Sequence, residues 1–333
     1  MSTLHDMPHG IEVVGILGAG TIGASWAALF LAAGLEVDVY DPSPEGEAFV
    51  RDYVRHAWPS LERLGLARRG DPGRLRFVAT PEEAVARAQF VQESVPERIE
   101  IKHALYRRIE DHLDPRAIVC SSASGLLVKE MQAGWQNPGR FILGHPFNPP
   151  HLIPLVELLG NEKTEPGVLE LAEQFYAACG KITIRVNKEV PGHVANRLQA
   201  ALWREAIHLV VEGVATVGDV DKAVSAGPGL RWSVMGPHML FNLGSGGHGL
   251  GVFCERFAPS FQRWWDDLGQ PTLDPETIRK LVDGVKAEED GRQFHDLAAE
   301  RDRKIVEASK AITDAAYPTR AIDVVGERKV AAR

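Results

Sequence analysis

Cysteine is scarce in this chain of 333 residues. The three that occur, Cys120, Cys179 and Cys254, stand far apart. Disulfide-stabilised folds and thiolate metal centres need several cysteines at short, regular spacings. The sequence therefore predicts neither, and it fits a reducing, cytoplasmic compartment. The histidines also lack the spacing of metal ligands, so we expect no metal site.

Long apolar runs and an excess of basic charge are absent too. No apolar segment approaches the roughly 18 residues of a membrane span, and the first ten residues do not resemble a signal peptide. The formal net charge is −8, which disfavours a nucleic-acid or anionic-membrane partner. We expect an intracellular protein of about two domains that acts on a small molecule.

A glycine-rich turn stands between an apolar, β-branched run over Ile11–Leu17 and an alanine-rich helical stretch that ends near Ala33. It reads G-x-G-x-x-G in the strand–turn–helix context of a dinucleotide-binding motif. The glycines permit a tight turn and close backbone approach to a pyrophosphate, and the helix N-terminus attracts the phosphates. Glycines also mark ordinary turns, so the motif alone is weak evidence. The predicted contacts are Gly18, Gly20, Thr21, Ile22 and Gly23.

An acidic residue follows the second predicted strand. Glu36–Tyr40 ends at Asp41, about twenty residues beyond the glycines, where a carboxylate accepts hydrogen bonds from the adenosine ribose. The same charge repels a 2′-phosphate, and only Arg51 is placed to reach back and offset it. The sequence therefore predicts NAD as the cofactor in preference to NADP.

Strand and helix patterns alternate as far as residue 187 and then give way to helices alone. The first pattern predicts an α/β domain over 1–187, a doubly wound Rossmann-type fold with a mostly parallel sheet. We expect a smaller all-helical domain over 188–316 and a tail over 317–333. The expected helices of the second domain are Pro191–Gly213, Asp219–Ser225, Phe253–Leu268, Pro275–Lys286 and Gln293–Ile312, with a glycine- and proline-rich loop over 227–237.

Two polar residues interrupt the apolar segments around the sequence GHPFNPPHLIPLVEL. His145 precedes a group of prolines, and Glu157 lies among leucines and valine. A buried carboxylate needs a hydrogen-bonded or charged partner, and His145 is the nearest group that also makes chemical sense. Histidine, with an ordinary pKa of about 6.5, can act as a base near neutrality. A core histidine beside an edge glutamate is the structural alternative.

Six motifs in this order resemble the 3-hydroxyacyl-CoA dehydrogenase superfamily: GAGTIG, QESVPE, SSASG, GHPFNPP, LVEL and PGHVANRLQ. The resemblance extends over nearly the whole chain. It is strongest to the CoA-independent branch, the L-carnitine dehydrogenases and the lambda-crystallin-like L-gulonate 3-dehydrogenases. Within that branch ALWREA and the pair Arg231 and Trp232 look more like the carnitine enzymes.

The resemblance implies roles for particular residues. His145 would be the general base, oriented by Glu157, while Ser124 and Asn196 would polarise the substrate oxygen. The implied cofactor contacts are Glu97, Lys102, Ser122 and Asn148. Three residues depart from the pattern: Ser122 and Gly125 replace the usual Asn and Ser of the SSASG loop, and His193 stands where phenylalanine is usual.

Two residues of the second domain are candidates for substrate binding. The guanidinium of Arg231 could bind a carboxylate, and a surface arginine without a ligand is an equally good interpretation. The indole of Trp232 could bind a quaternary ammonium group through cation–π contact. The leading hypothesis is NAD-dependent oxidation of a small free 3-hydroxy acid, with L-carnitine ahead of L-gulonate. A 3-hydroxyacyl-CoA dehydrogenase and a non-enzymatic, crystallin-like NAD-binding protein are the alternatives. By analogy we expect a homodimer through the helical domain.

Overall fold

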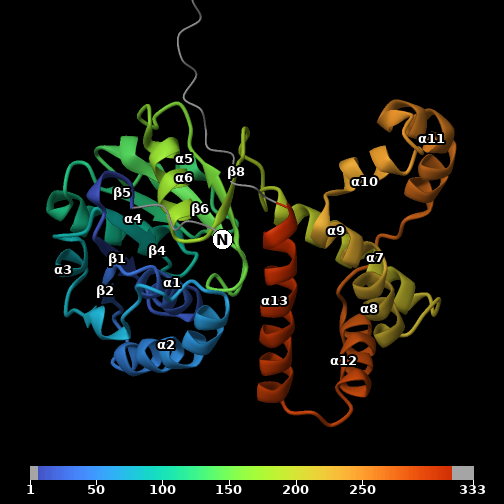
Figure 1. Cartoon of the computed structure of the whole chain (residues 1–333), viewed down its shortest axis with the longest axis horizontal. Coiled ribbons are helices and arrows are strands. Elements are labelled where there is room, and N and C mark those ends of the chain that lie inside the picture. Colours follow the sequence, from blue (N-terminus) through green and yellow to red (C-terminus); the bar gives the residue numbers. More distant parts are fainter. Residues whose placement is uncertain (1–6, 317–333) are drawn as a thin grey trace, which may run out of the picture. The chain divides into compact units, whose positions relative to one another are not determined.

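The computed structural model describes residues 7–316 of the chain (Figure 1). The structure divides into two compact units, and the boundary lies between Ala200 and Ala201. The break therefore falls inside a helix, later than the predicted boundary after residue 187. The predicted tail, 317–333, lies outside the described residues.

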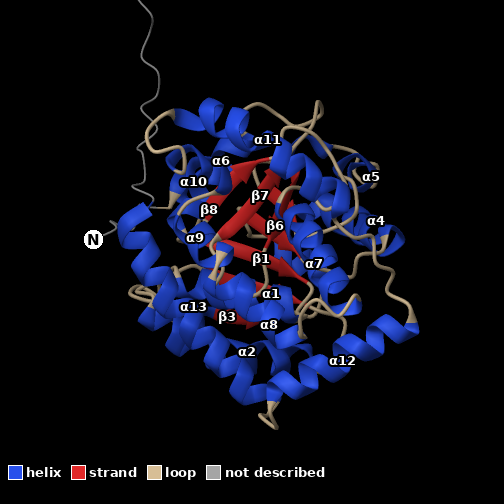
Figure 2. Cartoon of the chain, turned by 90° about the vertical axis from the view of Figure 1, so that its right-hand side faces the viewer, coloured by secondary structure: helices blue, strands red, loops and turns tan. Residues whose placement is uncertain are grey.

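The first unit contains one eight-stranded sheet, red in Figure 2, with the strand order β3-β2-β1-β4-β5-β6-β7-β8. All neighbouring strands pair in parallel except β6 and β7, which are antiparallel. The strands are β1 Val13–Leu17, β2 Glu36–Tyr40, β3 Leu75–Phe77, β4 Phe90–Glu93, β5 Ile118–Ser121, β6 Phe141–Pro146, β7 Leu155–Leu159 and β8 Ile182–Arg185. This confirms the predicted mostly parallel, doubly wound sheet.

Helices cover both faces of this sheet, so the unit has two apolar cores. One core joins the sheet to α1, α2 and α6, and the other joins the opposite face to α3, α4 and α5. Side chains that alternate along the buried strands supply both cores. The helices are α1 Thr21–Ala32, α2 Gly46–Arg63, α3 Pro81–Val85, α4 Ile99–Ile109, α5 Val128–Gln132 and α6 Val168–Ala178.

The helix α1 is apolar on nearly every side, which explains why it lies deep in the first core. Trp26 stacks on Phe30 at 5.2 Å between ring centroids, and Phe30 lies 5.4 Å from Phe175 of α6. These contacts hold the N-terminus of α1 at the carboxyl end of β1, where parallel sheets bind their ligands.

The second unit is helical, and no strand follows β8 among the described residues. Its helices, with α7 spanning the unit boundary, are α7 Ala195–Val211, α8 Val217–Ala226, α9 Pro228–Val234, α10 Pro237–Leu243, α11 Gly249–Asp267, α12 Pro275–Glu289 and α13 Phe294–Ala316. The expected loop over 227–237 is wrong: it contains α9 and the beginning of α10. Each of these helices begins with a proline. The first helical turn tolerates proline, because the N–H group that proline lacks would have no partner within the helix there. Within residues 7–316, no helix is both long and apolar enough to cross a membrane.

A buried carboxylate ties α4 to the sheet. Glu93, at the end of β4, is fully buried and accepts a hydrogen bond from Lys102 Nζ at 2.6 Å. Its other oxygen accepts hydrogen bonds from the hydroxyl groups of Tyr106 and Ser121, both at 2.8 Å. The ammonium of Lys102 is itself 1% exposed. The pair is thus a fully desolvated ion pair whose remaining hydrogen-bonding positions are filled.

Removal of one partner of this ion pair should lower the free energy of unfolding, because the other charge stays buried without a counter-charge. Lys102→Met keeps the side-chain volume but leaves the Glu93 carboxylate without its cation. We expect the free energy of unfolding to fall by about 3 kcal/mol, measured by urea denaturation. The exposed control Lys163→Met should change it by less than about 0.5 kcal/mol. Equal effects of the two variants would contradict a stabilising role for the pair.

Candidate active site

The two residues singled out from the sequence face each other across the antiparallel pair β6–β7. His145 and Glu157 occupy directly opposite positions in the register. The imidazole Nδ1 lies 2.8 Å from Glu157 Oε2. Both side chains are buried, with His145 4% exposed and Glu157 not exposed at all. The expected contact between them is therefore present, and its short distance follows from one strand pairing.

The second oxygen of Glu157 holds the beginning of α7. Oε1 accepts hydrogen bonds from the backbone amides of Val194 and Ala195, at 2.9 and 3.0 Å. Burial alone would raise the pKa of this carboxyl, but the hydrogen bonds from His145 and the two amides outweigh it. The pKa of Glu157 consequently lies below its ordinary value. The carboxylate is ionised at neutral pH, so it favours the His145 tautomer that carries its proton on Nδ1.

Nε2 of His145 faces a serine. Ser124 Oγ lies 3.1 Å from it, within hydrogen-bonding distance. Glu97 holds the loop that carries this serine. Its Oε1 accepts hydrogen bonds from the backbone amides of Ser124, at 2.8 Å, and Leu126, at 3.0 Å, and from that of Gly125. Glu97 therefore fixes the position of the serine beside the imidazole. Its predicted role as a cofactor contact remains a proposal.

A cavity of about 350 Å³ opens at Nε2. Its lining residues are Ile22, Ser122, Ser124, His145, Pro146, Phe147, Asn148, Asn196 and Gln199. The carboxamides of Asn148, Asn196 and Gln199 have no side-chain hydrogen bond within the described residues, so they are available to a ligand. Six of these residues were predicted as site residues: Ile22, Ser122, Ser124, His145, Asn148 and Asn196. Gln199 was missed, although it follows Asn196 by three positions and so shares its helix face.

The glycine-rich turn fits a dinucleotide. A side chain at Gly23 would lie 1.8 Å from the Gly18 carbonyl oxygen, so only glycine allows this approach of helix to turn. A side chain at Gly20 would enter open space, the volume that a pyrophosphate needs. The carboxylate of Asp41 accepts the amide of Ala19 at 2.7 Å, which fixes the acid beside the turn. Thr21 and Ile22 form the first turn of α1.

The hydroxyl of Ser122 is held at the cavity wall by three side chains. Gln92 Nε2 lies 2.8 Å from it, Ser94 Oγ 2.9 Å and Trp26 Nε1 3.3 Å. A residue that departs from the family pattern is thus incorporated in a complete hydrogen-bond network. Its predicted cofactor contact is compatible with its place in the cavity lining.

The prediction that Lys102 contacts the cofactor finds no support in this geometry. Its ammonium is 1% exposed and is engaged by Glu93, and the residue does not line the cavity. The sequence could not reveal this, because the motif places Lys102 near the site without saying which way its side chain points.

The loop after His145 is tied to α1 and β8. Lys181 Nζ donates to the carbonyl oxygens of Pro150 and, at 2.7 Å, Ile153, and it lies 4.9 Å from the Trp26 ring centroid. His151 Nδ1 lies 2.8 Å from Ser25 Oγ of α1. The cofactor helix and the loop that carries Asn148 therefore form one rigid assembly.

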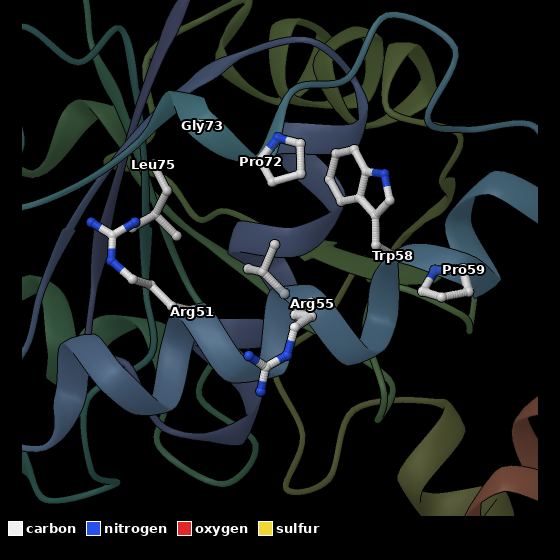
Figure 3. Close-up of a pocket in the computed structure, with 8 residues that line it drawn as sticks. Arg51, Arg55, Trp58, Pro59, Pro72, Gly73 and Leu75 are labelled. Atoms are coloured by element: carbon white, nitrogen blue, oxygen red, sulfur yellow. The ribbon is translucent and has the colours of Figure 1, made fainter.

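A larger cavity, of about 470 Å³, lies between α2 and the segment before β3 (Figure 3). Arg51, Val54, Arg55 and Trp58 form its wall on α2, with Leu75 on β3. Its lining contains no histidine, acid or hydroxyl group, so it cannot supply a general base. The smaller cavity is the candidate active site.

The two candidate substrate residues belong to the second unit. Arg231 and Trp232 lie on α9, and Trp232 is 39% exposed. The aromatic side chains that follow in sequence pack on one another: Phe241 stacks on Phe253 at 4.9 Å, and Phe261 lies 5.1 Å from Trp264. Phe241 and Phe253 therefore pack against each other, whereas Trp264 and Trp265 are 57% and 62% exposed and do not belong to a buried core. The substrate roles of Arg231 and Trp232 remain proposals.

The sequence matches two domain families. Residues 13–190 match the 3-hydroxyacyl-CoA dehydrogenase, NAD binding domain, and residues 192–281 match the 3-hydroxyacyl-CoA dehydrogenase, C-terminal domain. Among curated proteins, L-carnitine dehydrogenase of Streptomyces coelicolor is 46% identical over 91% of this chain and 96% of its own length. L-carnitine dehydrogenase of Pseudomonas putida is 43% identical over 91% of this chain and 94% of its own.

A solved structure extends the comparison. It is a 5-formyl-3-hydroxy-2-methylpyridine 4-carboxylic acid 5-dehydrogenase, described as an NAD+-dependent dismutase. The TM-score is 0.78 at 32% identity, over 92% of this chain and all of that one. Both units of the present chain therefore have counterparts in a solved NAD-dependent enzyme.

The lowered pKa of Glu157 has a consequence for acid stability. The folded protein binds this proton less tightly than the unfolded chain, so ionised Glu157 contributes stability above the unfolded pKa of about 4.3. That contribution is lost as the pH falls through the lower folded value. We expect Glu157→Gln to have a lower Tm near neutral pH and a shallower fall of Tm below about pH 5, measured by calorimetry. The exposed control Glu162→Gln should keep the wild-type profile, and a wild-type profile for Glu157→Gln would refute the argument.

Proposed function

The chain belongs to the 3-hydroxyacyl-CoA dehydrogenase family, and we propose that its substrate is a small free 3-hydroxy acid, with L-carnitine as the first candidate. It is an NAD-dependent oxidoreductase that acts on a CH–OH group. The observation that carries the proposal is the buried imidazole of His145, which meets Glu157 through Nδ1 and Ser124 through Nε2 and lines a polar cavity. The relatives' names support the choice of a free acid over a CoA ester.

The reaction removes two hydrogens from one carbon. The glycine-rich turn would hold NAD, which would supply the acceptor for the hydride of the C3–H bond. His145 Nε2 takes the proton of the C3 hydroxyl as the carbon–oxygen double bond forms, and the imidazole becomes an imidazolium. The hydroxy acid is thereby oxidised to the keto acid, and the proton passes from His145 to solvent after turnover. In the reverse direction the imidazolium returns this proton to the carbonyl oxygen.

Neighbouring groups stabilise the charge that develops during this step. Glu157 faces Nδ1 at 2.8 Å, so its carboxylate favours the imidazolium and keeps the ring in a productive orientation. Ser124 Oγ and the Asn196 carboxamide would polarise the substrate oxygen, because both line the cavity beside Nε2. No metal is needed to polarise that oxygen in this scheme.

The cofactor would lie along the turn and the beginning of α1. The residues proposed to hold it are Gly18, Gly20, Thr21, Ile22, Gly23, Asp41, Ser122 and Asn148. The first-turn amides of α1 would face the pyrophosphate, and Asp41 would accept the ribose hydroxyls. The cavity position of Ser122 and Asn148 supports contacts near the nicotinamide.

The charged ends of the substrate require groups that the cavity lacks, because its only titratable lining residue is His145. We therefore assign the carboxylate to Arg231 and the trimethylammonium to Trp232, both on α9. A guanidinium grips a carboxylate through two parallel hydrogen bonds, and an indole face attracts a quaternary ammonium. With L-gulonate as substrate, Trp232 would face a polyol.

A substrate panel tests the proposal. NADH formation from NAD would be measured with L-carnitine, L-gulonate, 3-hydroxybutyrate and 3-hydroxybutyryl-CoA. We expect the highest kcat/KM for L-carnitine, and Trp232→Leu should lower it about tenfold while sparing 3-hydroxybutyrate. A clear preference for the CoA ester would overturn the free-acid assignment and the role of Arg231.

His145→Ala on the best substrate tests the mechanism. Loss of the base should lower kcat by a factor of about 100 to 10,000, while the Kd of NAD, measured by calorimetry, should stay within about twofold. The exposed His56→Ala is the matched control and should retain activity. Equal losses of turnover and NAD affinity in His145→Ala would contradict its assignment as the base.

We also propose a homodimer through the helical unit. Several large apolar side chains of that unit are exposed: Val214, Leu230, Trp264, Trp265 and Phe294, at 69%, 62%, 57%, 62% and 85%. Large apolar side chains exposed in this number on one unit favour association with another protein surface. A second copy of the chain is the partner that we assign to it.

Light scattering after gel filtration should give twice the chain mass of 36.5 kDa. Trp264→Glu with Trp265→Glu should shift the mass towards one chain, because a buried charge in an apolar interface is costly. Phe49→Glu, an exposed apolar position of the first unit, is the control and should leave the mass unchanged. A mass of one chain for the wild type would contradict the proposed homodimer.

We infer a cytoplasmic location from the thiols. All three cysteines are free, two of them buried and Cys254 exposed. An exposed free thiol is more typical of a reducing compartment than of an oxidising one.

A further inference from the structure

A buried lysine contacts two elements of the active-site wall without lining the cavity itself. Lys181 lies between α6 and β8, is 6% exposed and is absent from the cavity lining. Its Nζ donates hydrogen bonds to the carbonyl oxygens of Pro150 and, at 2.7 Å, Ile153, and it lies 4.9 Å from the centroid of the Trp26 ring. The mechanism described above gives this side chain no role.

Each of these contacts leads to a residue of the cavity. Pro150 and Ile153 belong to the loop that begins directly after Asn148, and Asn148 lines the cavity. Trp26 on α1 donates a hydrogen bond from Nε1 to Ser122 Oγ at 3.3 Å, and Ser122 lines the cavity as well. One buried amine is thus in contact with the supports of both residues that are proposed to lie near the nicotinamide.

The surroundings of Lys181 are unfavourable for a cation. Its Nζ contacts two carbonyl oxygens and an indole ring, and none of these groups carries a full negative charge. Burial lowers the pKa of Lys181 to about 7, while Cys179 acts in the opposite direction. A methionine would fill a similar volume without the cost of removing an amine from water. Packing alone therefore does not explain a lysine at this position.

The hydrogen-bond donors of the lysine do explain it, and they do not depend on its charge. An ammonium group has three N–H donors and a neutral amine has two, so either form can donate to both carbonyl oxygens. Loss of the amine would take one donor from each carbonyl group. A buried carbonyl without a partner costs free energy, and the loop would regain it only by moving towards water.

These contacts favour an indirect role in cofactor binding. We propose that Lys181 is a positioning residue for NAD, because it holds the loop that follows Asn148 against Trp26 and so keeps Asn148 and Ser122 in place together. The proposal rests on the cofactor contacts assigned to these two residues in the proposed function. Small displacements of binding groups change affinity strongly, even when their cause lies outside the site. The effect of Lys181 therefore falls on the affinity for NAD and not on the proton transfer.

The experiment compares the wild type with Lys181→Met and Lys181→Gln. Methionine removes the donors, whereas glutamine keeps two N–H donors on a shorter side chain. The first readout is the Kd of NAD, measured by titration calorimetry without substrate. We expect the Kd to rise about tenfold in Lys181→Met and at least about threefold in Lys181→Gln. The Tm of each variant establishes that it is folded, and Lys181→Gln carries the test if Lys181→Met does not fold.

A double-mutant cycle with Asn148→Ala is the second readout. If Lys181 acts through the loop of Asn148, its substitution should raise the Kd by a smaller factor in the Asn148→Ala background than in the wild type. In turnover assays the KM for NAD should rise, while kcat at saturating NAD should stay within about threefold. An unchanged Kd in both Asn148→Ala and Ser122→Ala would contradict the cofactor contacts of the proposed function, and the present proposal with them.

Gln132→Leu is the matched control. Gln132 is 1% exposed and does not line the cavity, and its Nε2 also donates to two backbone carbonyl oxygens, those of Pro138 at 3.5 Å and Phe141 at 3.2 Å. We expect this variant to have a lower Tm and the wild-type Kd of NAD. Folded Lys181 variants that bind NAD within about twofold of the wild type, while Asn148→Ala binds it more weakly, would overturn the proposal alone. Lys181 would then stabilise the fold in the way that Gln132 does.

Discussion

One carboxylate, Glu157, joins the chemistry of this protein to its architecture. Its Oε2 orients the imidazole of His145, and its Oε1 accepts the first amides of α7. The helix that carries Asn196 and Gln199 therefore begins where the proposed base, His145, is held. The carboxylate must stay ionised for both contacts, and the hydrogen bonds that lower its pKa ensure that it does. Base, cavity and the beginning of α7 consequently depend on a single buried charge.

The other buried polar groups at this edge of the sheet are satisfied, and this makes the site rigid. Glu93 has its cation and two hydroxyl donors, Ser122 has three side-chain partners, and Lys181 donates to two carbonyl groups. Satisfied networks of this kind fix a geometry before the substrate arrives.

Much of the first unit could be predicted because its signals are local. The bounds of the strand Glu36–Tyr40 agree with the sequence pattern to the residue, since it is an apolar run between clear turn residues. The segment 227–237 was misjudged because glycine and proline were taken as loop markers, although proline also begins helices. Lys102 was placed near the cofactor by its motif, but its side chain turns into the core.

By itself the sequence determined the class of fold and the dinucleotide turn, because each depends on residue type and short spacing, and it singled out His145 and Glu157 as the proposed base and its partner. Only the tertiary structure decided which atoms meet. The strand pairing brings His145 and Glu157 together across twelve residues, the α7 helix brings Gln199 into the cavity, and His193 comes to lie against the catalytic ring. These contacts join segments far apart in the chain, and no local pattern encodes the direction in which a side chain points once several elements pack around it.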